Sequence, residues 1–340
     1  MILVAGGTGT LGAQVVRLLI DRGQSVRVLT RDPARARQLP DTVQTLIGDL
    51  RDPTAVAAAV RGCATVISAV HGFVGPGKPS PESIDRDGNR ALNQAAAAAG
   101  VEHMVLVSVL GAAQDHPMSL HRAKYAAEQA LQASDLQWTI IRPAAYLETW
   151  IAIIGAKLPG NSLVFGPGRN PINFVSAGDV AAIIDLAVHD QSLRGQLLEV
   201  AGPEQLTFTQ IAERLITASG KPGRIRRIPL PMLRAMSVLA RPVSPVFARQ
   251  AQAAVVMNTS DMTADAAAIR DRLPTIPATT LDDVITRQPP LEVPDARGDA
   301  PSSRGKQTAA SSSSEPPASS RGLICADAAR SRNRGDRCNA

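Results

Sequence analysis

Residues 1–12 constrain the fold more than any other segment of this sequence. An apolar run, Ile2–Ala5, leads straight into glycines at positions 6, 9 and 12, and an amphipathic segment follows. A strand, a tight glycine turn and a helix start in this order can carry a dinucleotide pyrophosphate, because backbone amides at a helix N-terminus attract an anion. The residues of this turn that we expect to contact a cofactor are Gly6, Thr8, Gly9, Thr10, Leu11 and Gly12.

Strand-like and helix-like segments alternate up to Arg142. The expected strands are Ile2–Ala5, Ser25–Thr30, Val43–Ile47, Thr65–Val70, His103–Ser108 and Gln137–Arg142. The expected helices are Thr10–Asp21, Pro53–Arg61, Pro81–Ala99 and Met118–Ser134. Continuous Val/Ile/Leu strands between helices predict an α/β fold with a doubly wound parallel sheet of the Rossmann type. The carboxyl ends of its strands share one edge, where ligands bind.

We expect three parts in the chain: a dinucleotide-binding domain over 1–150, a smaller α/β substrate lobe over 151–287, partly interleaved with the first, and a disordered tail over 288–340. The tail mixes Pro, Ser, Gly and Arg without apolar periodicity, so burial cannot offset its ordering entropy. In the second part, the expected segments are strands at Asn173–Val175 and Leu197–Val200, helices at Ser176–His189 and Thr207–Ser219, and helical material from Pro231 to Val256.

Composition excludes several classes of partner. Aromatic residues make up 3% of the chain, and the net charge of +6 comes without a recognisable reading motif, so no direct nucleic-acid partner is expected. Cys63, Cys325 and Cys338 form no metal-ligand pattern or disulfide framework, which favours a reducing compartment and predicts no metal site. Charges interrupt the apolar stretch Leu136–Leu158, so no transmembrane segment is expected.

Location and partners follow from the same features. The first strand begins at the amino terminus with no signal peptide before it, so we expect a cytoplasmic protein. Its expected partner is a small-molecule substrate. The oligomeric state is left open.

The end of the second strand bears on the choice of cofactor. An acid there binds the ribose 2′-hydroxyl of NAD, whereas an arginine accommodates the 2′-phosphate of NADP. Here Val26–Thr30 ends without an acid and Arg31 follows, while Asp32 before Pro33 suits a helix cap. NADP(H) is therefore favoured and NAD(H) remains possible; a solvent-facing Arg31 would leave the preference undecided.

Two further strand ends lie at the same edge. Asp49, after the third strand, is suited either to accept a hydrogen bond from the adenine amino group or to form a turn, and Leu50 would pack against the ring. After the fourth strand, the small residue Ala69 would let the backbone approach the adenosine ribose and the nicotinamide half of the cofactor.

The chain from Met1 to about Ile285 resembles the atypical, NmrA-like branch of the short-chain dehydrogenase/reductase superfamily. The matching motifs are Gly6-Gly7-Thr8-Gly9-x-x-Gly12, Gly48-Asp49-Leu50-Arg51-Asp52, Asp85-x-x-Gly88-Asn89, Gly100-Val101-x-x-Met104-Val105, Lys124-x-x-x-Glu128, Trp138-Thr139-Ile140-Ile141-Arg142-Pro143, Asp179-Val180-Ala181 and Gly202-Pro203. A weaker likeness links the Leu230–Val256 region to bacterial relatives of the complex I accessory subunit.

One departure from the superfamily concerns the proton donor. Its usual acid is a Tyr four residues before the Lys, on the same helix face, but here that position is Leu120. Tyr125 is adjacent to Lys124 and would point about 100° away on a helix. The standard Ser–Tyr–Lys relay is therefore absent.

Three interpretations of the proton chemistry remain open. The resemblance implies that Lys124 contacts the nicotinamide ribose, and it could also act as the acid; alternatively His121 or Tyr146 supplies the proton; or no proton is transferred. Ser108 stands where the superfamily has its substrate-orienting hydroxyl, unless it caps a turn near Gly111.

Two more residues have alternative roles. Pro143 either directs the following backbone N–H toward the carboxamide or simply ends a strand. Asn89 is expected to bridge helix and sheet rather than touch a ligand.

The expected function is that of an NAD(P)H-dependent oxidoreductase, which transfers hydride to a small carbonyl, quinone or activated alkene. The missing Tyr supports an alternative, a non-catalytic NADP(H) sensor. A sugar-nucleotide epimerase or dehydratase is a third candidate, weakened because those reactions also use the Tyr.

A basic stretch in the second lobe allows a different kind of contact. No Asp or Glu occurs from Arg214 to Ser260, and Pro231–Ala240 is expected to form a short basic amphipathic helix, with Met232, Leu233, Met236 and Leu239 beside Arg234 and Arg241. Most such stretches are solvated faces, but this one could bind an anionic substrate or contact a membrane surface peripherally.

Overall fold

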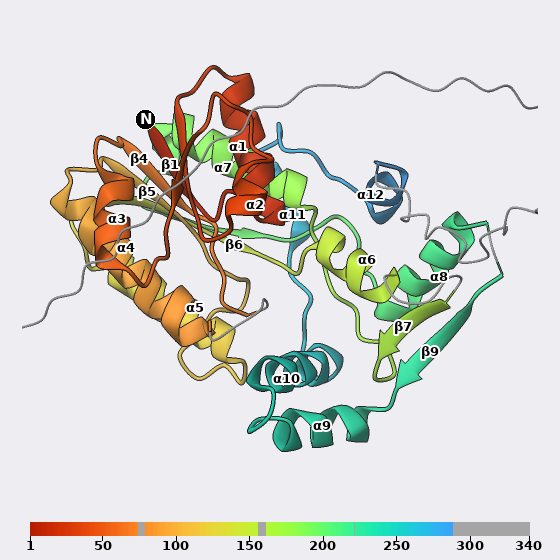
Figure 1. Cartoon of the computed structure of the whole chain (residues 1–340). Coiled ribbons are helices and arrows are strands. Elements are labelled where there is room, and N and C mark those ends of the chain that lie inside the picture. The colour runs from red at the N-terminus through yellow and green to blue at the C-terminus, as the bar shows by residue number, and fades with distance from the viewer. Residues whose placement is uncertain (74–78, 156–160, 221, 288–340) are drawn as a thin grey trace, which may run out of the picture. The chain divides into compact units, whose positions relative to one another are not determined.

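A seven-stranded parallel sheet organises this protein, in a computed structural model that describes residues 1–73, 79–155, 161–220 and 222–287 (Figure 1). The strand order is β3-β2-β1-β4-β5-β6-β8, which confirms the expected Rossmann-type sheet. The strands of this sheet are β1 Ile2–Ala5, β2 Val26–Thr30, β3 Gln44–Ile47, β4 Thr65–Ser68, β5 His103–Val107, β6 Gln137–Pro143 and β8 Gln196–Val200.

Helices cover both faces of the sheet (Figure 1). One face packs against α1, α7 and α11, and the other against α3, α4 and α5. The helices are α1 Thr10–Asp21, α2 Pro33–Ala36, α3 Pro53–Val60, η1 Glu82–Arg86, α4 Asp87–Ala98, α5 Ser119–Gln132, α6 Leu147–Gly155, α7 Ala177–His189, η2 Gln191–Leu193, α8 Phe208–Ala218, α9 Leu230–Leu239, α10 Pro245–Thr259, α11 Ala266–Arg272 and α12 Leu281–Arg287.

The apolar strands form because both of their faces are buried. In β1, Ile2 and Val4 join the cluster under α1 and α7, while Leu3 and Ala5 join the cluster under α3, α4 and α5. Successive side chains of a strand point to opposite faces, so a continuous apolar run serves two cores at once.

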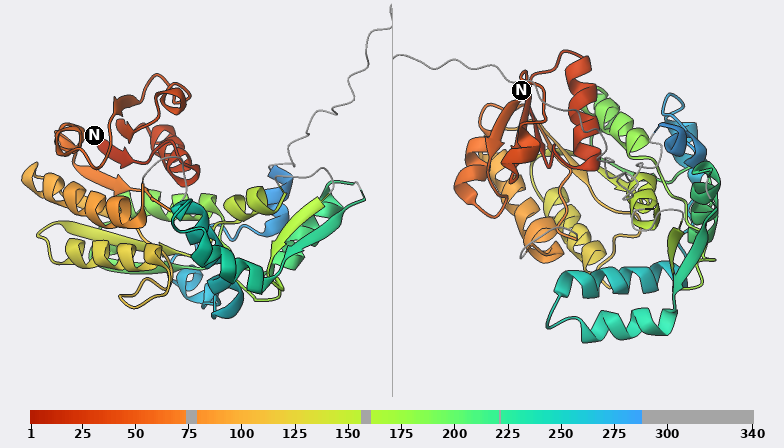
Figure 2. Two further views of the ribbon diagram at one scale, coloured as in Figure 1. Left: turned by 60° about the horizontal axis from the view of Figure 1, so that its bottom comes forward. Right: turned by 45° about the vertical axis from the view of Figure 1, so that its right-hand side comes forward.

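A second, smaller layer extends from the main sheet. Two strands, β7 Asn161–Phe165 and β9 Arg224–Ile228, pair in parallel, and α6, α8 and α12 form an apolar cluster beside them. Helices α9 and α10 form a hairpin (Figure 2). None of the helices within the described ranges is both long and apolar enough to cross a bilayer.

Three sequence-based expectations need correction. The segment Asn173–Val175 is not a sheet strand; Val175 makes an isolated bridge to Tyr146, and the Asn173 side chain bonds Gly202 O and Ala264 N instead of a ladder partner. The helix expected from Pro81 opens with a wider π-helical turn, η1. The pair β7–β9 was not expected, because Arg224–Ile228 carries more charge than a typical strand.

The domain boundaries remain partly a prediction. The described residues fall within a single compact unit, and β8, from the expected substrate lobe, pairs with β6 in the main sheet. If a second lobe begins near residue 150, its chain therefore also contributes a strand to the main sheet. The expected tail, 288–340, lies outside the described residues.

Candidate functional site

The glycine turn between β1 and α1 leaves no room for side chains. Gly6 has φ +84°, and a Cβ there would lie 2.8 Å from the Ala69 carbonyl oxygen. A Cβ on Gly12 would collide with the Gly6 carbonyl. Helix α1 begins at Gly9 without a side-chain cap, so its first amides are available to an anion. The turn therefore fits a dinucleotide pyrophosphate.

The other residues expected at this turn have different environments. Thr8 Oγ1 lies 2.9 Å from Thr30 Oγ1, which ties the turn to the end of β2. Thr10 is exposed, whereas Leu11 is buried in the core under α1. Ala69 is half-buried and faces the turn through its carbonyl.

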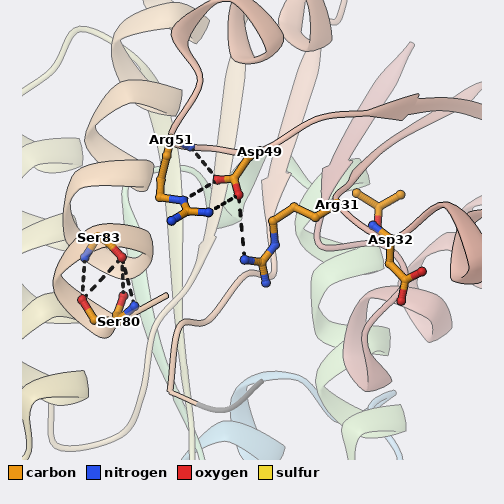
Figure 3. A network of polar contacts seen from close by, with 7 residues as sticks. Arg31, Asp32, Asp49, Arg51, Ser80 and Ser83 are labelled. Carbon is orange, nitrogen blue, oxygen red and sulfur yellow. Dashed lines mark hydrogen bonds and ion pairs between the residues drawn. The ribbon is translucent and has the colours of Figure 1, made fainter. Parts of the chain in front are cut away.

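A charged cluster lies at the ends of β2 and β3 (Figure 3). Arg51 Nη2 lies 2.7 Å from Asp49 Oδ2, and Arg31 Nη1 lies 3.8 Å from the same oxygen. The hydrogen bond from the Arg51 side chain lowers the pKa of Asp49, and the charge of Arg31 adds to this. Both guanidinium groups are about half exposed. We call Arg31 and Arg51 the arginine pair.

The neighbouring acids behave as turn and cap residues. The Arg51 backbone N–H donates to Asp49 Oδ1 at 2.9 Å, as in an Asx turn. Asp32 accepts from the Ala34 and Arg35 amides and caps α2, which confirms its expected role. Leu50 is buried in the core between the sheet and α3, so its expected contact with adenine remains a prediction.

Lys124 is enclosed by three oxygen atoms. Its Nζ donates to the carbonyl oxygens of Val70 and Val107, each at 2.8 Å, and lies 3.0 Å from Asp85 Oδ1. The Lys124 side chain is 4% exposed and that of Asp85 0%. Asp85 Oδ2 also accepts from the Gly72 amide at 2.7 Å. The ion pair therefore fixes the main chain at residues 70 and 72, at the end of β4.

His71 lies between these two fixed points. Its side chain reaches solvent, while loss of hydration against the surrounding protein atoms lowers the pKa of its imidazole. The charge of Asp85 opposes this shift, and those of Lys124 and Arg31 reinforce it. Sequence reasoning missed His71, although a polar side chain just beyond a buried strand at the ligand edge is a detectable signal.

The remaining catalytic candidates each have a buried, unsatisfied polar atom. Ser108 Oγ, His121 Nδ1 and Tyr146 OH have no hydrogen-bond partner among the described residues. Burial lowers the pKa of His121 to about 3 and raises the pKa of Tyr146 well above its usual value. His121 also stacks on His116 with ring centroids 3.8 Å apart. Such orphaned groups are unusual and are commonly met by water or a ligand.

The Arg-Pro strand end has a structural role. Arg142 binds Glu128 through two hydrogen bonds, at 2.9 and 2.6 Å, which joins β6 to α5. After Pro143, the Ala144 N–H donates to the Val200 carbonyl at 2.8 Å, so it is engaged in the sheet. The expected contact of Pro143 with the cofactor remains a prediction.

Asn89 joins a helix to the sheet. Its side chain accepts from Ser68 Oγ at 2.6 Å and donates to the Asp85 carbonyl at 2.7 Å. This bridging position agrees with the expectation from the sequence, and it also supports the turn that carries Asp85.

Comparison with known proteins supports this interpretation of the glycine turn. Residues 6–190 match the NAD(P)H-binding family. This chain belongs to that family. It is 33% identical over 246 residues to an NAD(P)H azoreductase from Xenophilus azovorans, covering 72% of this chain and 83% of the relative. The expected resemblance to the atypical short-chain dehydrogenase/reductases and the expected class of cofactor, NAD(P)H, are thus confirmed.

Two further proteins with different functions are similar to this chain. The photosystem II assembly factor Ycf39 of Synechocystis is 30% identical over 242 residues, covering 71% of this chain and 74% of the relative. The NADPH complex of an Escherichia coli NADPH-dependent quinone oxidoreductase has the same fold, with a TM-score of 0.69 and 24% identity over 84% of this chain and 99% of that one.

Proposed function

We propose that this member of the NAD(P)H-binding family is a reductase whose acceptor is a small electron-poor molecule, such as a quinone, an azo compound, a carbonyl or an activated alkene. The glycine turn is the observation that carries the proposal, because Gly6 and Gly12 let its backbone fold tightly and the first amides of α1 have no side-chain cap, as pyrophosphate binding requires. Bound NAD(P)H would supply the hydride. The azoreductase relative supports a reductase rather than an epimerase.

NADP(H) is the cofactor that we propose for this site. The arginine pair presents two guanidinium groups at the end of β2 and β3, where the 2′-phosphate of NADP lies in Rossmann folds. Asp49 is already neutralised by Arg51, so it would repel that phosphate little. Arginine binds phosphate in a bidentate manner, which adds specificity to charge.

His71 is the side chain that we propose as the proton donor. Reduction of R–N=N–R′ to R–NH–NH–R′ needs a hydride at one nitrogen and a proton at the other. Lys124 is less suited than His71, because loss of its proton would leave Asp85 buried without a counter-charge. Lys124 and Asp85 then act as positioning residues, since they hold the backbone on both sides of His71.

The other expected candidates retain supporting roles in this proposal. His121 Nδ1 and the Tyr146 hydroxyl are buried without a hydrogen-bond partner in the described part of the chain, and burial moves both pKa values far from neutrality, whereas His71 is exposed and can exchange its proton with water. The unsatisfied hydroxyls of Ser108 and Tyr146 could instead donate hydrogen bonds to an acceptor.

A panel of acceptors tests the proposal. NADPH oxidation is followed at fixed enzyme concentration with an azo dye, a benzoquinone, an aldehyde and an α,β-unsaturated ketone, beside direct measurement of NADPH binding. We expect turnover with at least one acceptor. Micromolar NADPH binding without turnover on any of them would overturn the reductase assignment.

A second candidate function is a non-catalytic assembly factor whose binding to a partner depends on NADP(H). The similarity to Ycf39 and the replacement of the usual Tyr by Leu120 favour it. Binding without turnover in the panel is the outcome that this candidate predicts.

The location and partners of the chain remain proposals. We propose a cytoplasmic reductase, because Cys63 is a buried free thiol and NADPH is available in that compartment. The expected peripheral membrane contact through Pro231–Ala240 gains support from the exposed apolar residues of α9, Met232, Val238 and Leu239.

A further inference from the structure

The outer face of α9 is apolar and exposed. The inner face packs on α10 through Leu233, which is 1% exposed. On the outer side, Met232 is 54% exposed, Val238 57% and Leu239 75%. Just beyond the helix, Val243 is 88% exposed. A surface helix normally turns a polar face to water, so the outer face of α9 has the composition of a contact surface.

The exposed apolar residues of α9 lie on one side of the helix. Positions 232, 235 and 239 are spaced three and four residues apart, and all of them and position 238 are exposed, which places them on one side of the helix. Phe247, near the start of α10, is 42% exposed. We call Met232, Val238, Leu239, Val243 and Phe247 the hairpin patch. Figures 1 and 2 show that α9 lies on the side of α10 away from the main sheet.

The surroundings of the hairpin patch are basic. Arg234 and Arg241 are exposed beside it, and no acidic residue occurs from Arg214 to Ser260. Strand β9 adds three exposed arginines, Arg224, Arg226 and Arg227. An apolar stripe with basic flanks and no acids has the chemistry of a helix that lies in the interface of an anionic bilayer.

We propose that the hairpin patch docks this protein onto an anionic lipid surface, with α9 lying in the plane of the headgroups. A second copy of the chain fits less well, because a symmetric contact would bring Arg234 and Arg241 of both copies together with no acid to pair them. A bilayer satisfies both features at once, since acyl chains accept the apolar stripe and phosphates accept the arginines.

The hairpin also connects this surface to the candidate site. Arg249 of α10 donates to the carbonyl oxygens of Gly72, at 3.5 Å, and Pro79, at 3.3 Å. Phe73 packs with Met118 and Val256 in a small cluster under α10. The hairpin therefore links the docking face to the backbone beside His71. If the chain is the proposed reductase, the favoured acceptor is a lipid-dissolved quinone.

Vesicle flotation tests the docking without depending on catalysis. The full chain is mixed with vesicles of phosphatidylcholine alone or with added phosphatidylglycerol. We expect it to float with the mixed vesicles, and to release at high salt because arginine–lipid attraction is screened. Failure to float with either composition overturns the proposal, and equal binding to both removes its charge component.

Matched variants locate the contact. We expect Arg234→Gln with Arg241→Gln to weaken partitioning about 25-fold, since each arginine near an anionic surface contributes about fivefold. Val238→Ser with Leu239→Ser should weaken it about tenfold or more. The controls are Arg17→Gln on α1 and Ile153→Ser on α6, both exposed away from the hairpin. Equal loss in the controls would refute the assignment to α9.

Two further measurements separate the outcomes. Unchanged NADPH affinity and thermal midpoint in each variant exclude misfolding, because the altered side chains are exposed. Light scattering reports the oligomeric state; a dimer that Val238→Ser with Leu239→Ser dissociates would show that a second copy occupies the patch and overturn the lipid proposal. Turnover of a water-soluble quinone stays unchanged in these variants, so failure of docking is distinguishable from failure of the proposed function.

Discussion

At the residue scale, Arg31 and Arg51 lie at different distances from the Asp49 carboxylate, and this difference suits them to different roles. Arg51 holds the carboxylate at 2.7 Å, whereas Arg31 is 3.8 Å away and keeps donors free for another anion. Arg51 uses donors on Asp49 and could still share its charge with a phosphate. Arg31 is therefore the stronger candidate for direct contact with the NADP 2′-phosphate.

Substitution of the arginine pair tests that assignment. We expect Arg31→Ala to weaken NADPH binding about tenfold or more, the worth of a hydrogen bond to a charged group, and to leave NADH binding unchanged. Arg51→Ala should also weaken NADPH, because it exposes the Asp49 charge. Calorimetry with both cofactors measures this, with Arg61→Ala at the far end of α3 as control. Equal loss for NADH and NADPH would contradict the assignment.

The proton donor is tested with two acceptors that differ in proton demand. A triarylmethane dye cation becomes neutral by gaining hydride alone, whereas an azo dye also needs a proton. We expect His71→Gln to slow azo reduction about 100-fold on the acid side of the His71 pKa and to leave reduction of the cation and NADPH binding unchanged. A matched substitution, His189→Gln, lies far from the site on α7 and should change neither rate.

The direction in which the rate of azo reduction changes with pH follows from the protonation of His71. The donor form of His71 is the imidazolium, which exists below a pKa lowered from its usual 6.5. Azo reduction should therefore fall as the pH rises through that pKa, and the profile of His71→Gln should be flat in this range. A pH profile that is the same in both proteins would rule out His71 as the donor.

Lys124 shows why the sequence left the proton chemistry open. The motif Lys124-x-x-x-Glu128 was recognisable, but the ion pair joins Lys124 to Asp85, 39 residues earlier, across the turn η1. That pairing depends on how β4, β5 and α5 meet in space. Only the three-dimensional structure shows that the Lys124 ammonium is enclosed and that the Lys124–Asp85 pair holds the backbone on both sides of His71.

At the scale of elements, the sequence predicted those that bury apolar residues on both sides. The strands β1, β4 and β5 were recognisable because their apolar runs are unbroken. Strand β9 was missed because its charged residues are exposed and only Ile225 and Ile228 are partly buried. Hydrophobic periodicity in a sequence reflects burial of one face of an element. A pair of strands with few buried side chains, such as β7–β9, therefore gives no recognisable pattern.

Two buried histidines on β5 and α5 make these elements sensitive to acid. Burial lowers the pKa of His103 to about 4 and that of His121 to about 3. Both would be protonated more readily in the unfolded chain, so each contributes stability that is present above pH 6.5 and is lost as the pH falls toward its folded value.

Urea unfolding at pH 6.5 and pH 5 measures this loss. We expect the free energy of unfolding to fall by about 1.5 kcal/mol for each histidine between these values. His103→Gln and His121→Gln should each reduce the pH dependence while they lower stability at pH 6.5. A wild-type stability that does not change between pH 6.5 and 5 would contradict the burial of neutral imidazoles.

At the scale of the whole molecule, chain order and spatial order diverge after β6. Helix α7 packs on α1, and β8 completes the sheet beside β6, and both come from the segment expected to form a smaller lobe partly interleaved with the first domain. The sequence located these elements and their interleaving with the first domain, but not the pairing of β8 with β6, because strands of similar composition are compatible with several positions in the sheet. The sheet that carries the cofactor turn is therefore finished by residues beyond 190.

Truncation tests whether the first part is an independent domain. A chain ending at residue 150 lacks α7 and β8, which exposes apolar side chains of β6 and α1 to water, including Ile141 and Val15 in the core shared with α7. We expect this fragment to lose cooperative thermal unfolding and NADPH binding, because the buried apolar area that stabilises the sheet is lost. A chain ending at residue 287 keeps every described element and should retain both. Differential scanning calorimetry and NADPH titration of the two fragments measure this, and a cooperative transition with full NADPH affinity in the shorter fragment would establish an autonomous domain over 1–150.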